Sequence, residues 1–230
     1  MPRRRLVVFV KQARPGRVKT RLAAEIGVID AVWWYRHQTA RLLRRLARDR
    51  RWQTVLAVAP DTAVGAKGWP GMPTGLTRQP QGPGDLGQRM ARALTQWTCW
   101  GMGRETGLET SLGTGLGTRP RMARDARRGP VLVIGSDIPG ITPQHLAQCF
   151  ALLQGHDAVL GPADDGGYWA IGLRHGGKAA PAGLFKGVRW SSPHTLADTR
   201  TSMAGLTVAL AATLNDVDTL ADLHRLKAAQ

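Results

Sequence analysis

Asp137 stands where a carboxylate could bind a metal ion. An apolar run, residues 131–134, is followed by Gly135 and Ser136 and then by Asp137. Pro139 comes two positions after Asp137. A carboxylate at the end of a strand, in a turn that a proline stiffens, is well placed to bind Mg²⁺ or Mn²⁺ bridging a diphosphate. The alternative is an aspartate that hydrogen-bonds its own backbone in a turn. A metal site needs a second acid, and the pair around Val217 near the end of the chain, Asp216 and Asp218, offers one.

The segment around Asp218 also has a structural interpretation. Asp218 could cap the helix that we expect to follow it, and Thr219 with Asp222 has the spacing of a capping box. Capping by one of these residues and metal binding by its neighbour are compatible. Both interpretations of this segment therefore stay open on these residues alone.

A basic loop, residues 11–22, follows the first apolar run of the chain. A glycine-containing turn that opens onto a helix start suits a phosphate, because backbone N–H groups, the helix dipole and nearby cations act on the same anion. The loop is not a Walker A motif, because Val18 precedes Lys19. A basic surface turn explains the segment equally well. The residues expected to meet phosphate are Lys11, Gly16, Lys19, Thr20 and Arg21.

Two further turns are candidates for contact with substrates. Gly84 and Asp85 mark a loop that meets a helix start; they could contact a nucleobase or ribose, or simply begin the helix. The second turn covers residues 164–167. It could be an ordinary tight turn, or its glycines could let an acceptor approach while Asp165 accepts a proton or a hydrogen bond from a sugar hydroxyl. The residues expected at the acceptor are Asp164, Asp165, Gly166, Gly167, Trp169 and Trp190.

The elements that position these residues alternate along the chain. Strands are predicted over residues 5–10, 54–59, 131–134, 157–160, 168–173 and 206–210, and helices over 20–26, 29–50, 85–97, 142–153, 192–203 and 219–228. This alternation predicts an α/β layered fold with a mainly parallel sheet, in which ligands bind at the carboxyl ends of the strands. Residues 101–129 are rich in Gly, Thr and Arg, which predicts a flexible insertion in one domain spanning 1–230.

Composition excludes several classes of protein. The chain has 230 residues and is 43% hydrophobic, which excludes an intrinsically disordered chain, and its two cysteines exclude a disulfide scaffold. No stretch approaches the roughly 18–20 apolar residues that a membrane span requires. The first apolar run is shorter than the roughly 7–15 residues of a signal peptide, so we expect a cytoplasmic protein. The net charge is +16, and residues 1–50 carry 14 Lys and Arg against three acids, which would attract polyanions.

The chain resembles the DUF2064 family. The resemblance rests on four segments in the family's order: 11–22, 81–90, 135–139 with 161–173, and 216–223. It covers nearly the whole chain except 101–129. The family is also called the radical-SAM/selenodomain-associated transferase 1 family and belongs to the GT-A-like nucleotide-diphospho-sugar transferases, with the molybdenum-cofactor and phospholactate guanylyltransferases as distant relatives. Ala13 stands where the family usually has Pro, and Leu220-Ala221 where it usually has Pro-Glu.

The resemblance implies a three-layer α/β/α fold of the Rossmann-like GT-A type, whose N-terminal half holds a nucleotide. By matching position, Lys11, Lys19 and Arg21 would meet the phosphates. Asp137 and Asp218 would bind Mg²⁺ or Mn²⁺. We expect Asp137, Lys19 and Asp165 to act in catalysis.

These expectations favour a metal-dependent transferase with a nucleotide-activated substrate, most simply a nucleotide-diphospho-sugar glycosyltransferase with a small-molecule acceptor. One alternative is a nucleotidyltransferase that moves a guanylyl or cytidylyl group from a nucleoside triphosphate to a phosphorylated acceptor. A second is a nucleic-acid-binding protein that uses the basic N-terminal half; no recognisable nucleic-acid module accompanies that charge. A third is a degenerate transferase that scaffolds a partner enzyme. The sequence does not indicate an oligomeric state.

Overall fold

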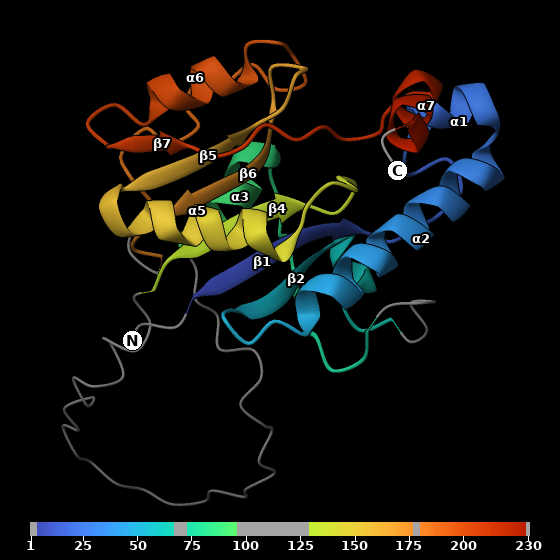
Figure 1. Cartoon of the computed structure of the whole chain (residues 1–230), viewed down its shortest axis with the longest axis horizontal. Coiled ribbons are helices and arrows are strands. Elements are labelled where there is room, and N and C mark those ends of the chain that lie inside the picture. Colours follow the sequence, from blue (N-terminus) through green and yellow to red (C-terminus); the bar gives the residue numbers. More distant parts are fainter. Residues whose placement is uncertain (1–3, 67–72, 96–128, 177–179, 229–230) are drawn as a thin grey trace, which may run out of the picture.

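Seven strands and the helices around them make up the described chain (Figure 1). The computed structural model describes residues 4–66, 73–95, 129–176 and 180–228. The strands are β1 Arg5–Lys11, β2 Gln53–Ala59, β3 Thr77–Pro80, β4 Val131–Gly135, β5 Ala158–Pro162, β6 Tyr168–Leu173 and β7 Val208–Leu210. The α-helices are α1 Thr20–Ile26, α2 Val28–Ala47, α3 Leu86–Thr95, α5 Pro143–Gly155, α6 Thr195–Ser202 and α7 Leu220–Ala228, and a 3₁₀ turn covers Asp61–Ala63.

The strands form one sheet in the order β3-β2-β1-β4-β6-β5-β7. Every neighbouring pair is parallel except those made by β6, which runs antiparallel to β4 and β5. The prediction of a mainly parallel sheet is confirmed. Because β6 is reversed, its first residues lie beside the last residues of β4, with Ala170 paired to Ile134. The turn before β6 therefore lies at the edge where β4 ends.

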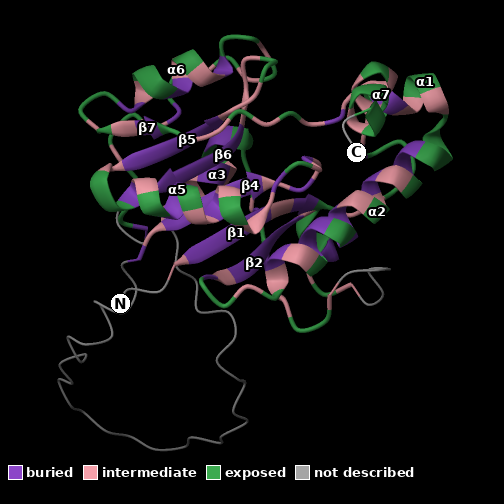
Figure 2. Ribbon diagram, in the orientation of Figure 1, coloured by how far each residue is buried: buried purple, intermediate pink, exposed green. Residues whose placement is uncertain are grey.

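Apolar side chains cover both faces of the sheet, because a strand sends successive side chains to opposite sides. Leu6, Val8 and Val10 of β1 belong to a core cluster that also contains buried residues of α2 and α5. Val7 belongs to a second cluster that contains buried residues of α3 and reaches Met203, directly after α6. Figure 2 shows the buried strands between exposed helix faces. The predicted three-layer α/β/α fold is confirmed.

Each predicted helix and strand matches an observed one within about three residues over the described part of the chain, and β3 is a further strand that the predicted ranges do not include. The sequence signal at α5 is confirmed in detail: Thr142 is the N-cap, its hydroxyl accepts from the N–H of His145, and Pro143 stands in the first turn. The first helix, α1, and the last helix, α7, lie side by side (Figure 1). The backbone N–H of Leu220 in α7 donates to the carboxylate of Glu25 in α1 at 3.3 Å. The predicted flexible insertion at 101–129 lies outside the described residues except for Gly129.

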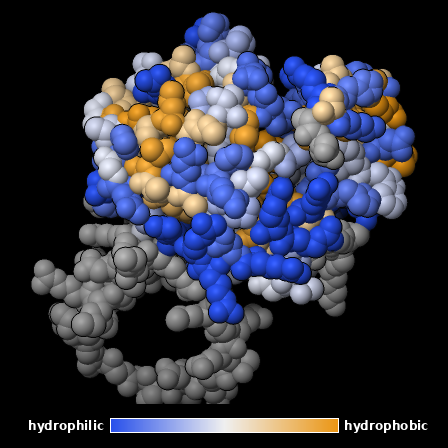
Figure 3. Space-filling model, in the orientation of Figure 1, coloured by the Kyte–Doolittle hydropathy of each residue, from blue (hydrophilic) through white to orange (hydrophobic). Residues whose placement is uncertain are grey.

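The surface is mostly hydrophilic on the face in Figure 3, with apolar side chains gathered over β5 and β7. None of the helices in the described ranges combines the length and the apolar character that crossing a bilayer requires.

Candidate active site

Three aspartates from distant parts of the chain meet around one ammonium group. Asp137 follows β4, and Asp216 and Asp218 lie between β7 and α7. One oxygen from each carboxylate lies within 4.8 Å of the others. Nζ of Lys19, from the loop after β1, is 2.6 Å from Asp218 Oδ1, 2.7 Å from Asp137 Oδ2 and 3.5 Å from Asp216 Oδ2. We call these three carboxylates the aspartate cluster.

Lys19 reaches the aspartate cluster because of its backbone conformation. It is the N-cap of α1 with φ 47° and ψ 49°, in the left-handed region that side chains other than glycine rarely adopt. Val18 before it is buried against Val32 and Tyr35 of α2, which fixes the loop. The Lys19 side chain is 3% exposed. Arg21, the second residue of α1, is largely exposed, with Nη1 3.3 Å from Asp218 Oδ2.

Tyr35 ties the loop after β1 to the loop after β4. Its hydroxyl accepts a hydrogen bond from the backbone N–H of Lys11 at 2.9 Å and lies 3.0 Å from Oγ of Ser136, the residue before Asp137. Burial raises the pKa of this phenol above its usual value. One neutral side chain from α2 therefore fixes the distance between the basic loop and the first acid of the cluster.

The charges of the cluster shift each other's protonation. Burial alone would lower the pKa of Lys19, but the charges of Asp137 and Asp218 and the hydrogen bonds to them raise it. Burial raises the pKa of Asp216 to about 6; the charge of Lys19 opposes this shift, and the charges of the neighbouring carboxylates add to it. The ammonium of Lys19 is thus a permanent cation held by carboxylates.

The donor set of the cluster suits a hard divalent cation. Mg²⁺ and Mn²⁺ prefer carboxylate oxygens, at about 2.1 Å for Mg²⁺, and the spacing of the three carboxylates lets each contribute one ligand. Lys19 Nζ contacts the same carboxylates, so a metal ion and this ammonium would compete for them. Asp137, Asp216 and Asp218 are therefore the residues that could hold a metal.

Hydrogen bonds fix the segment that carries Asp216 and Asp218. On one side, the side chain of Asn215 makes two hydrogen bonds with Asp164. Asn215 Nδ2 donates to Asp164 Oδ2 at 2.5 Å, and Asn215 Oδ1 accepts from the backbone N–H of Asp164 at 2.9 Å. On the other side, Thr219 and Asp222 form the predicted capping box at the start of α7. The two acids of the cluster lie between these anchors.

A pocket of about 270 Å³ opens beside the aspartate cluster. Asp137, Asp165 and Asp216 line it, and Met90, Tyr168 and Trp190 are among the apolar and aromatic side chains of its walls. Burial raises the pKa of the Tyr168 phenol, so the group stays protonated. The hydroxyl donates a long hydrogen bond, 3.8 Å, to the sulfur of Met90.

The structure separates the residues expected at the acceptor. Asp165, Gly167, Trp169 and Trp190 line the pocket, whereas Asp164 is paired with Asn215 and Gly166 is not among the lining residues. Gly166 has φ +82°, and a Cβ there would meet Pro193 O at 2.2 Å, so this glycine serves the turn.

The residues expected at the nucleotide fall into three groups. Lys19 and Arg21 meet the aspartate cluster; Lys11, Gly16 and Thr20 are exposed in the loop or at the start of α1. Asp85 caps α3: its carboxylate accepts from the N–H of Gln88 at 2.8 Å, and its own N–H donates to Gln88 Oε1. Gly84, with φ +98°, leaves room for that Gln88 side chain.

Asp216 joins the cluster in addition to the two predicted metal ligands, Asp137 and Asp218. Its signal was present in the sequence, since it stands two residues from Asp218 in a segment that extends past a strand. In an extended segment, residues two apart point to the same side.

The family model for "Uncharacterized protein conserved in bacteria (DUF2064)" matches residues 42–192. This chain is a DUF2064 protein. The DUF2064 chain is also similar to a solved structure from Desulfovibrio desulfuricans G20, a candidate nucleotide-diphospho-sugar transferase by its description. The two are 30% identical, with 98% of this chain and 87% of the other covered and a TM-score of 0.73. A second match is Rv0371c from Mycobacterium tuberculosis H37Rv in complex with manganese, at 16% identity, 97% of each chain and a TM-score of 0.44. The curated proteins contain no match to the DUF2064 chain.

Proposed function

We propose that the protein is a metal-dependent glycosyltransferase that uses a nucleotide-diphospho-sugar as donor. The observation that carries the proposal is the convergence of Asp137, Asp216 and Asp218 on Lys19 at the carboxyl edge of the sheet. Ligands of open α/β sheets bind at this edge. Further support comes from the relative in Desulfovibrio desulfuricans G20, whose description names that class of transferase.

The aspartate cluster would hold the divalent cation through Asp137, Asp216 and Asp218. When bound, the cation would neutralise charge on the donor diphosphate and so favour its departure. Lys19 would give up its contacts with the carboxylates and turn to the phosphates, and Arg21 would add a second positive charge from the start of α1. The binding of donor and metal would therefore replace one set of ion pairs by another.

Asp165 would act on the acceptor. A hydroxyl oxygen of the acceptor forms a bond to the anomeric carbon of the sugar, and the bond from that carbon to the diphosphate oxygen breaks. The electron pair of the broken bond leaves with the nucleoside diphosphate, and the hydroxyl proton passes to the carboxylate of Asp165. Geometry favours this assignment, because Asp165 lines the pocket beside Asp137.

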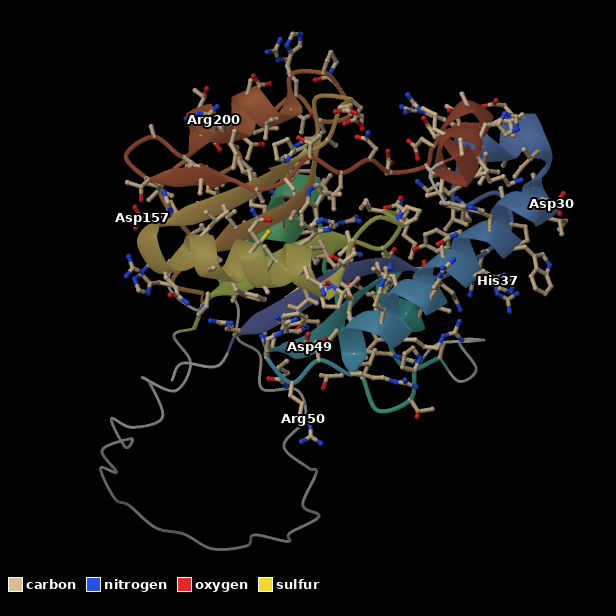
Figure 4. All side chains as sticks on the ribbon, viewed as in Figure 1. Asp30, His37, Asp49, Arg50, Asp157 and Arg200 are labelled. Carbon is tan, nitrogen blue, oxygen red and sulfur yellow. The ribbon has the colours of Figure 1, made fainter. Side chains whose placement is uncertain are left out.

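The proposal is tested by calorimetry with Mg²⁺ and a panel of UDP-sugars, GDP-sugars, GTP and CTP. We expect one class of nucleotide-sugar to bind only when Mg²⁺ is present, and Asp218→Asn to abolish that binding. Asp30→Asn is the matched control, because it removes the same charge at an exposed position in the first turn of α2 (Figure 4).

Binding of the triphosphates alone would contradict the proposal and favour nucleotidyl transfer. An absence of any nucleotide binding, by a protein with its fold intact, would favour a scaffold in place of an enzyme.

A further inference from the structure

The pocket beside the aspartate cluster has charge of one sign. Among the described residues that line it, the charged ones are Asp137, Asp165 and Asp216. Lys19 contacts Asp137 and Asp216 but is not among the lining residues. Asp165 accepts a hydrogen bond from the N–H of Gly167 at 2.8 Å and makes no ion pair within the described part of the chain.

Trp190, an aromatic residue of the pocket wall, is held in place by its neighbours. The rings of Trp190 and Phe185 lie 5.7 Å apart at 54°, and a Cβ on Gly87 of α3 would come within 2.9 Å of both residues. The glycine thus lets Trp190 lie directly on the helix. Arg189, the neighbour of Trp190, makes a two-pronged ion pair with Asp198 of α6 at 2.8 and 2.9 Å.

A phosphate group entering this pocket would meet no cationic side chain among the lining residues that the structure describes. Moving an anion from water to a partly apolar site is costly unless an opposite charge meets it, and nearby carboxylates add repulsion. The cations of the site are committed elsewhere: Lys19 binds the aspartate cluster, and in the proposed reaction the donor diphosphate takes up both Lys19 and the metal. The charge of Asp165 then remains unbalanced.

We propose that this pocket binds the acceptor and selects a neutral or cationic alcohol, carried on a ring with an apolar face, against phosphate monoesters. This proposal rests on the proposed function, because only a glycosyl transfer makes the ligand of this pocket an acceptor. A volume of about 270 Å³ lies near the lower end of ligand sites and suits a single ring in place of an oligomer. The ring would stack on Trp190 while its hydroxyl points to Asp165.

Three probes that share one ring and differ in charge test this selectivity: benzylamine, benzyl alcohol and benzyl phosphate. Their dissociation constants are measured by saturation-transfer NMR on the whole chain, in EDTA at constant ionic strength. We expect benzyl phosphate to bind at least about 10-fold more weakly than benzyl alcohol. The test is sharp because the net charge of +16 alone predicts the opposite order.

Variants locate the effect in the pocket. Asp165→Asn should narrow the gap between alcohol and phosphate at least about threefold, whereas the charge-matched Asp30→Asn should leave it unchanged. Trp190→Ala should weaken all three probes, with circular dichroism confirming the fold. The inference is overturned if benzyl phosphate binds as tightly as the alcohol, or if Asp165→Asn and Asp30→Asn behave alike.

Failure here and failure of the proposed function are distinguishable. Asp218 does not line the pocket, so Asp218→Asn should abolish nucleotide binding and leave the order of the probes intact. If nucleotide-sugars bind but benzyl phosphate is favoured, the selectivity is wrong and the donor assignment stands. If the probe order holds without nucleotide binding, the donor assignment is wrong.

Discussion

The two sides of the site differ in charge and in how they are built. On the β1 side, the first 50 residues carry a net charge of +11, with Arg14, Arg17 and Arg21 exposed around the basic loop. On the β4–β6 side, the charged residues of the described pocket lining are aspartates. Under the proposed function, this contrast would let an anionic donor bind on the basic side and an uncharged or cationic acceptor bind on the acidic side. Lys19 joins the sides, since it belongs to the basic loop and binds the acids of the other.

Strand direction produces this contrast. Parallel strands bring the loops after β1 and β4 to one edge of the sheet, and the reversed β6 brings the turn before it to the same edge. A basic loop and an acidic turn thereby lie at the same edge of the sheet although they are distant in the chain.

Removal of Asp137 should have the largest effect on this arrangement. Asp137→Asn deletes one of three carboxylates from the cluster, and we expect the affinity for Mn²⁺ to fall by about 100-fold. Titration followed by the electron spin resonance of free Mn²⁺ measures it directly. Asp30→Asn should bind Mn²⁺ as the unaltered protein does. Equal affinities for all three proteins would place the metal elsewhere.

Removal of Lys19 should sharpen the contrast. Lys19→Met leaves three carboxylates without the ammonium that contacts them, so we expect about 2 kcal/mol lower stability in EDTA. Because the competing cation is gone, Mn²⁺ should bind about 10-fold more tightly and restore the lost stability. Thermal unfolding with and without Mn²⁺ gives both quantities.

Lys11→Met is the control for Lys19→Met, because Lys11 has the same charge in the same loop but is exposed. It should change neither stability nor metal affinity by more than a few tenths of a kcal/mol. Weaker Mn²⁺ binding by Lys19→Met would show that the ammonium supports the metal site and does not compete with it.

The fold was predictable because its signals are local. The apolar run 131–134 and the cap at Thr142 each depend on adjacent residues, and both predictions are confirmed. The direction of β6 could not be predicted, since a short apolar run carries no record of which strands it will join. Register and neighbours are decided by packing of the whole sheet.

The site was predictable only in part, because its geometry depends on long-range contacts. The hydrogen bonds between Asp164 and Asn215 join segments 51 residues apart, and no residue near Asp164 in the sequence predicts them. Lys19 was expected to face phosphate, and in the structure it contacts the acids, because its left-handed backbone turns the side chain inward. That conformation is unusual for lysine and has no sequence signature.

Tyr35→Phe should loosen the connection between the two sides. It deletes the hydroxyl that binds the N–H of Lys11 and Oγ of Ser136, leaving buried partners unsatisfied, so we expect a loss of about 1.5 kcal/mol. Denaturant unfolding measures this, and Mn²⁺ affinity should fall slightly as Asp137 shifts. Tyr168→Phe deletes a hydroxyl that donates a long hydrogen bond to the sulfur of Met90, so it should cost less. If Tyr168→Phe costs more, Tyr35 does not connect the two sides.

Asp222→Asn should have the smallest effect, because Asp222 caps the helix next to the aspartate cluster and is not one of its three carboxylates. Burial alone would raise the pKa of Asp222, but hydrogen bonds from Thr219 and Arg225 lower it to about 2. A folded-state pKa below the unfolded value of about 4 stabilises the protein above that value, and the stabilisation is lost as the pH falls towards 2. We therefore expect the variant to lose about 1 kcal/mol at pH 7 and progressively less as the pH falls towards and below 2. Urea unfolding across this range tests it, and a loss independent of pH would show that the carboxylate charge plays no part in the cap.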